Sequence, residues 1–273
     1  MFKILQAKTT VLFFIIVLFL CSGAFAFPGP WQEVKDKHFV VLYKDYGDQA
    51  DAYELLRKAE EYYTKVAGQI GYSKYANFWT WNERVKIYIF PSQEEFARET
   101  HQPPWSRGYV VSDARLLSTR MIVTYRQEDN FSNGLLPHEI SHLLLRDFIG
   151  FDRYIPVWFD EGVAQLQEEQ KRSVFYKLMR KKLAQRNFIP LRTLNRMIIS
   201  GEEDQKQVLA FYAQSLTVVD FLLKEYGTAS FSQLCRNLRE GKKMEEAMRS
   251  AYGQAFRSFE NLEEKWMKYI ERH

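Results

Sequence analysis

The chain has little cysteine, and the little it has excludes a disulfide within the folded part. Of its 273 residues only Cys21 and Cys235 are cysteines, and Cys21 lies in an apolar N-terminal segment. Cys235 therefore has no partner in the rest of the chain, and the fold must be stabilised by its hydrophobic core. An aromatic content of 16% is compatible with a well-packed core.

An excess of either charge is also missing. The chain has 38 Lys and Arg against 34 Asp and Glu, a net charge of +4; without Lys3 and Lys8 of the N-terminal segment, 36 remain and the net charge is +2. This balance predicts neither nucleic-acid binding nor strong attraction to a membrane. Internal repeats and low-complexity segments are absent from the sequence as well.

Long apolar runs are confined to the N-terminus. Residues 9–20 are almost purely apolar, and Ala24-Phe25-Ala26 supplies the small residues that a signal peptidase reads. We predict a signal peptide over residues 1–26 and hence an exported protein, periplasmic or secreted. The alternative is an uncleaved segment in which residues 9–27 tether the chain to the membrane.

The rest of the chain divides into an α/β part and a helical part. Hydrophobic periodicity predicts strands at 38–43, 84–90 and 119–126, helices at 48–68 and 92–100, and long helical segments at 158–187 and 206–227. The predicted fold class is α+β. A mixed α/β lobe with a small sheet, residues 27–130, precedes a mainly helical lobe, residues 131–273, and together they form one domain with its functional site in the cleft between them.

Two histidines stand four residues apart in "LLPHEISHLLL", residues 135–145. On a helix, His138 and His142 lie on one face, so both can reach a single metal ion. Glu139 is rotated by about 100° from His138, where it can take a proton from a water that the ion activates. H-E-x-x-H is the zinc-hydrolase pattern, although a buried helix with two incidental histidines has the same sequence.

A catalytic zinc needs a third protein ligand. The remaining histidines, His38, His101 and His273, do not lie where a third histidine usually falls. Glu161 is well placed, because it follows His142 by nineteen residues and begins a second predicted helix. The alternative for Glu161 is a first-turn glutamate that stabilises the start of that helix.

Together these segments resemble the gluzincin zinc metallopeptidases, and more closely their small exported peptidase MA-like group. The resemblance is carried by "HEISH", residues 138–142, and "WFDEGVA", residues 158–164, and extends over most of residues 35–270. It implies one Zn²⁺ per chain held by His138, His142 and Glu161, with Glu139 as the general base.

The resemblance also suggests roles for the surrounding elements. An oxyanion-stabilising group is expected, and Tyr212 is the candidate, with a plain core tyrosine as the alternative. Strand 119–126 resembles the edge strand that aligns a peptide substrate. A G-x-M-E-N segment is missing, which favours an endopeptidase over an aminopeptidase. Gln165 replaces an acid that thermolysin-like relatives carry behind the zinc.

The sequence therefore predicts an exported zinc-dependent metallopeptidase that acts on a peptide or protein substrate, with no nucleic-acid partner. Membrane contact is expected only if the N-terminal segment stays uncleaved. The alternative function is a non-catalytic envelope protein that uses the zinc site for structure or partner binding. A basic amphipathic stretch, residues 171–186, fits contact with an anionic surface or, as is commoner, a solvated helix face.

Overall fold

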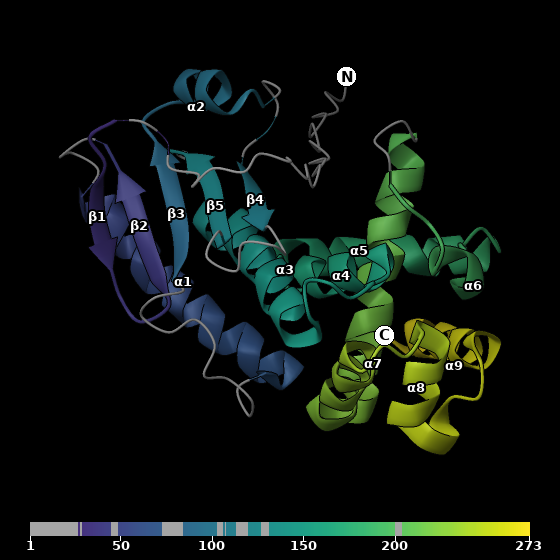
Figure 1. Cartoon of the computed structure of the whole chain (residues 1–273). Coiled ribbons are helices and arrows are strands. Elements are labelled where there is room, and N and C mark those ends of the chain that lie inside the picture. Colours follow the sequence, from purple (N-terminus) through teal and green to yellow (C-terminus); the bar gives the residue numbers. More distant parts are fainter. Residues whose placement is uncertain are drawn as a thin grey trace, which may run out of the picture.

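The computed structural model describes residues 27, 29–44, 49–72, 84–102, 106, 108–112, 120–126, 131–199 and 204–273. The predicted signal peptide, residues 1–26, lies outside these ranges. Within them, the structure contains no helix whose length and apolar character would suffice to cross a membrane. Figure 1 shows the sheet on one side of the molecule and most of the helices on the other.

Five described strands form one mixed sheet in the order β1-β2-β3-β5-β4. Their bounds are β1 Gln32–Lys35, β2 Phe39–Tyr43, β3 Val85–Phe90, β4 Gly108–Ser112 and β5 Arg120–Tyr125. β2, β3 and β5 run parallel, and β1 and β4 pair antiparallel at the two edges. The prediction that strand 119–126 is an edge strand is therefore wrong, because β3 and β4 cover both sides of β5.

Apolar clusters cover both faces of the sheet, which explains why Tyr88 is buried although its alternation predicts an exposed side chain. Val85 and Ile87 of β3 point into the main core, as their alternation predicts. Tyr88, predicted to face outward, is 2% exposed because it joins Phe90 in a smaller cluster on the opposite face. Trp31 packs on that cluster, and a parallel strand buried on both faces is the usual result.

Helices α1 (Gln49–Ile70) and α2 (Gln93–Thr100) complete the α/β part. α1 buries the apolar stripe that its periodicity predicts, including Ala52, Leu55 and Tyr63. α2 begins at Ser92, whose side chain accepts a hydrogen bond from the backbone N–H of Glu95, so the predicted N-cap is confirmed.

The helical part begins with a short π-helical turn, Phe131–Leu135. It continues through α3 Leu136–Ile149, α4 Val157–Gln165, α5 Glu169–Ala184, α6 Leu191–Leu194, α7 Gln205–Arg239, α8 Met244–Tyr252, a 3₁₀ turn Gly253–Ala255 and α9 Phe259–Arg272. α7 is broken at Gly227, where φ is 76°, so the helix predicted to end there does change direction.

The helix expected over 158–187 is two helices, because the chain turns between α4 and α5 at residues 166–168. That turn has a functional consequence, since it brings Glu168 back toward α3. The predicted fold class is confirmed: a small mixed sheet with α1 and α2 precedes a mainly helical half. The boundary near residue 130 and the cleft between the halves stay predictions.

Candidate metal centre

α3 positions the two histidines of the H-E-x-x-H segment. It is buried along almost its whole length, with Pro137 in its first turn, where a missing N–H is tolerated. His138 is 1% exposed and His142 is 6% exposed, one helical turn apart on the same face. The helix predicted from the sequence is thus confirmed, and both imidazoles point to one place.

α4 positions the carboxylate of Glu161 opposite this histidine pair. The chain leaves α3 at Gly150 and enters α4 after Pro156, so α4 crosses beside α3. Gly162, the next residue, allows α4 to approach α7 closely: a Cβ atom there would lie 2.5 Å from the backbone oxygen of Ser215. The glycine of the W-x-x-E-G-x-A segment therefore fixes the depth at which Glu161 enters the core.

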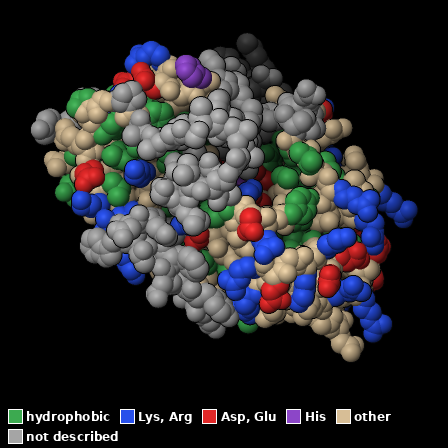
Figure 2. Space-filling view, viewed as in Figure 1, with side chains coloured by type: hydrophobic (Ala, Val, Ile, Leu, Met, Phe, Trp, Pro, Cys, Tyr) green, Lys and Arg blue, Asp and Glu red, His purple; other side chains and the backbone are tan. Residues whose placement is uncertain are grey.

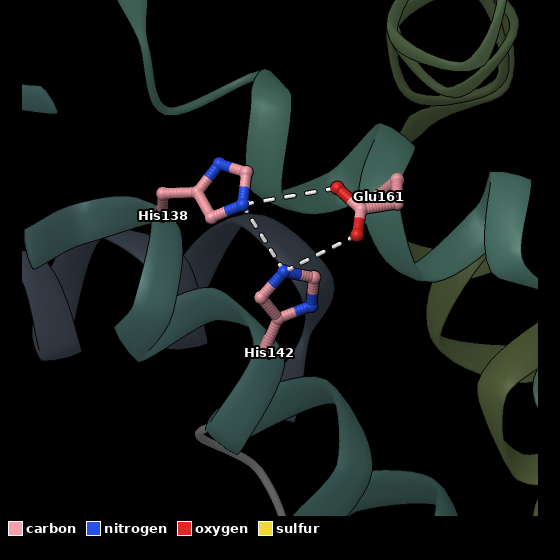
Figure 3. Close-up of side chains that lie close together, drawn as sticks. All are labelled: His138, His142 and Glu161. Carbon is pink, nitrogen blue, oxygen red and sulfur yellow. Dashed lines mark hydrogen bonds and ion pairs between the residues drawn. The ribbon is translucent and has the colours of Figure 1, made fainter. Parts of the chain in front are cut away.

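The three side chains converge, as Figure 3 shows. The Nε2 atoms of His138 and His142 are 3.1 Å apart. Each Nε2 lies 3.8 Å from a carboxylate oxygen of Glu161. Two ligands of one zinc ion can be separated by up to about 4.2 Å, twice a typical bond length. These three distances lie below that limit, so the three side chains could share a single ion.

On the side away from Glu161, each imidazole contacts one further carboxylate. Nδ1 of His142 lies 2.7 Å from Asp160, which also pairs with Arg146. Nδ1 of His138 lies 3.1 Å from Glu168, which pairs with Lys171. A carboxylate on Nδ1 fixes the tautomer and leaves Nε2 as the metal ligand.

The charges of this cluster shift the pKa values of its members. Burial alone would lower the pKa of His142, but Asp160, together with Glu161 and Glu139, raises it to about 9. Burial alone would raise the pKa of Asp160, but His142 and Arg146 outweigh it and hold that pKa well below its ordinary value. Asp160 is therefore a permanent anion behind His142.

The pKa of Glu139 shifts in the direction opposite to that of Asp160. Its side chain is 2% exposed, and burial raises the pKa of Glu139 despite the opposing charges of His138 and His142. Oε1 of Glu139 and Oε2 of Glu161 are buried without a hydrogen-bond partner among the described residues. Oε2 of Glu161 lies 3.8 Å from Nε2 of His138, so a metal ion bound between these side chains would give this buried oxygen a partner.

The predicted role of Tyr212 depends on where its side chain lies. Tyr212 is buried in α7, on the helix face that also carries Ser215 and Val219. Ser215 and Val219 lie against Gly162, so this face of α7 is turned toward α4. The role of Tyr212 as oxyanion stabiliser stays a prediction, as do the metal-binding and catalytic roles of the other four residues.

Sequence reasoning missed Asp160 and Glu168. It looked for the supporting acid at Gln165, which is buried and instead accepts a hydrogen bond from Lys171 over 3.4 Å. The available signal was the presence of an acid directly before Glu161 and another seven residues after it. Only the turn after α4 shows that Glu168 reaches α3.

Two histidines from one helix and a glutamate from the next could hold a metal ion, and hydrolytic zinc sites use the same donor types. The model of the peptidase MA superfamily matches residues 80–272 of the chain. The chain belongs to this superfamily, and its function is that of a metallopeptidase-like protein. A search of curated proteins found no match to the chain.

Proposed function

We propose that this protein is an exported zinc endopeptidase of the gluzincin type, with His138, His142 and Glu161 as its metal ligands. The observation that carries the proposal is the convergence of these three ligands around one point, with both imidazoles fixed from behind by acids. Two histidines and one glutamate, without cysteine, form a ligand set of catalytic rather than structural zinc sites.

The zinc ion would supply Lewis-acid polarisation of a water and of the peptide carbonyl. The residues of the chain do the rest. Glu139 accepts a proton from the attacking water while the water oxygen forms a bond to the carbonyl carbon. Its raised pKa makes Glu139 a stronger base than an exposed glutamate.

The same carboxyl group completes the reaction. Once protonated, Glu139 donates that proton to the amine nitrogen as the C–N bond breaks, so the group returns to its starting state. Tyr212 is proposed to donate a hydrogen bond to the oxyanion that forms meanwhile. Asp160 and Glu168 are proposed to hold the Nδ1 side of the two imidazoles, so that each ring is oriented with Nε2 toward the metal position.

β4 is proposed as the strand that aligns the substrate. It is an edge of the described sheet and pairs antiparallel with β5, and among the described strands none pairs with its other side, where an extended peptide could add. A strand that binds peptide backbone accepts many sequences and needs no free terminus, which supports endopeptidase action. The missing G-x-M-E-N segment supports the same choice.

The test is Glu139→Gln, assayed for cleavage of an unfolded protein and for bound zinc. We expect turnover to fall by at least about a thousandfold while zinc stays bound, because the amide keeps the shape but cannot accept the proton. Glu169→Gln, an exposed glutamate on α5, serves as the matched control and should retain activity. A natural protein that binds zinc but cleaves no peptide under any condition would favour the structural alternative.

A further inference from the structure

Residues 171–201 contain nine Lys and Arg and no Asp or Glu. This stretch covers most of α5, all of α6 and the loops around them. The other residues carry 29 basic and 34 acidic side chains, so the near-neutral net charge conceals one strongly basic segment. In Figure 2, Lys and Arg side chains gather on the right-hand side of the molecule, where α6 lies in Figure 1.

Most of these charges are not used by the fold. Three of the nine pair with acids elsewhere: Lys171 with Glu168, Arg172 with Asp220, and Arg192 with Glu245 and Glu260. The other six side chains form no ion pair with any residue that the structure describes, and all but Lys182 are exposed: Lys177, Arg180, Lys181, Lys182, Arg186 and Arg196. Six unpaired cations without a local acid repel one another, which favours an anionic partner.

Apolar side chains accompany these cations at the surface. Val174 is 55% exposed. Lys177 follows it by three residues and Lys181 by seven, so the three side chains share the outward face of α5. Ile198, directly after the Arg196-Met197 pair, is 74% exposed. These are two of the four large hydrophobic residues that are exposed in the described chain, with Tyr53 and Tyr154 elsewhere. A soluble polyanion gives an exposed isoleucine no apolar surroundings, whereas the boundary between the headgroups and acyl chains of a lipid layer does.

We propose that the α5–α6 face docks the protein onto an anionic lipid surface. The cations attract the headgroups within about 10 Å of the membrane, and Val174 and Ile198 enter the interface. This contact needs no residue of the N-terminal segment, unlike the membrane contact expected from the sequence. Because α5 begins next to Glu168, which touches His138, the metal centre would lie within one helix length, about 24 Å, of the surface.

The test is binding to vesicles of phosphatidylcholine alone and of phosphatidylcholine with one-third phosphatidylglycerol. Residues 27–273 are used, since they contain every described element, and cooperative thermal unfolding checks that they fold. We expect binding to the anionic vesicles only, lost at about 0.5 M salt. Lys177→Glu with Lys181→Glu should weaken it at least about tenfold.

Lys37→Glu with Lys86→Glu is the matched control, because both lysines are exposed on the sheet side and the charge change is the same. We expect less than a twofold effect. Equal loss in the two double variants, or no binding of the natural chain to anionic vesicles, would overturn the proposal.

A last variant separates lipid from other polyanions. Ile198→Ser should weaken vesicle binding and leave binding to heparin, a soluble polyanion, unchanged. If Ile198→Ser has no effect while heparin binds as tightly as the vesicles, the face recognises charge alone and the lipid assignment is wrong.

Discussion

At the scale of single residues, two carboxylates outside the proposed ligand set contact the histidines of the candidate metal centre. Asp160 lies behind His142 and Glu168 behind His138, and each acid is itself paired with a cation, Arg146 or Lys171. Such a chain of contacts fixes the orientation of each ring before a metal binds, so less conformational freedom is lost on binding.

Asp160→Asn should therefore weaken zinc binding by about ten- to a hundredfold, because the neutral amide no longer favours the tautomer that presents Nε2. Competition with a chromophoric chelator measures the affinity. Asp152→Asn, at an acid whose side chain is 75% exposed, is the control and should change little. Unaltered zinc affinity in Asp160→Asn would show that the 2.7 Å contact has no role in metal binding.

At the scale of elements, the position of Glu161 depends on how closely α4 and α7 pack. A Cβ atom at Gly162 would lie 2.5 Å from the backbone oxygen of Ser215 and 2.5 Å from a methyl carbon of Val219. Backbone cannot move aside as a flexible side chain can, so the helices must separate.

Gly162→Ala should lower the free energy of unfolding by about 1–3 kcal/mol and weaken zinc binding as Glu161 shifts. Gly68→Ala is the matched control, since a Cβ at that position in α1 meets no atom within 4 Å. Alanine there should be neutral or stabilising by up to about 1 kcal/mol. Chemical denaturation compares both; similar destabilisation in the two variants would contradict the close-packing argument.

A buried ion pair joins the sheet to the helical part. Arg120 at the start of β5 donates a hydrogen bond of 2.6 Å to Asp147 of α3, and the hydroxyl of Tyr72, just after α1, donates to the same carboxylate. Burial and the nearby charge of Asp147 raise the pKa of Tyr72 far above its ordinary value, so Tyr72 stays a donor.

Asp147→Asn leaves Arg120 buried without its counter-charge and should lower the free energy of unfolding by about 3–5 kcal/mol. The measurement is urea denaturation followed by fluorescence, with Asp152→Asn again as the surface control. A loss no larger than that of the control would mean that water or another group satisfies Arg120 in the variant.

At the scale of the whole molecule, the parts of the fold that periodicity marks were predictable, and those set by distant contacts were not. The α1 stripe, the Ser92 cap and the H-E-x-x-H helix follow from local patterns. β4 was missed because five residues of an edge strand carry little pattern, and β5 was therefore misplaced at the edge. Tyr88 was assigned to the wrong environment because the cluster that buries it comes from another part of the chain.

The site shows the same division. Its three proposed ligands and Glu139 could be predicted because each lies in a motif with fixed spacing. Asp160 and Glu168 could not, since their partners are set by the crossing of α3 and α4 and by the turn at residues 166–168.

The central claim, a three-ligand zinc centre, is tested most directly by counting zinc atoms per chain. Elemental analysis of purified residues 27–273 would be made for the natural sequence and for Glu161→Ala. We predict about one zinc per natural chain, and much less in Glu161→Ala, because two imidazoles alone hold the ion weakly. No zinc in the natural chain, or the same amount in both proteins, would contradict this account.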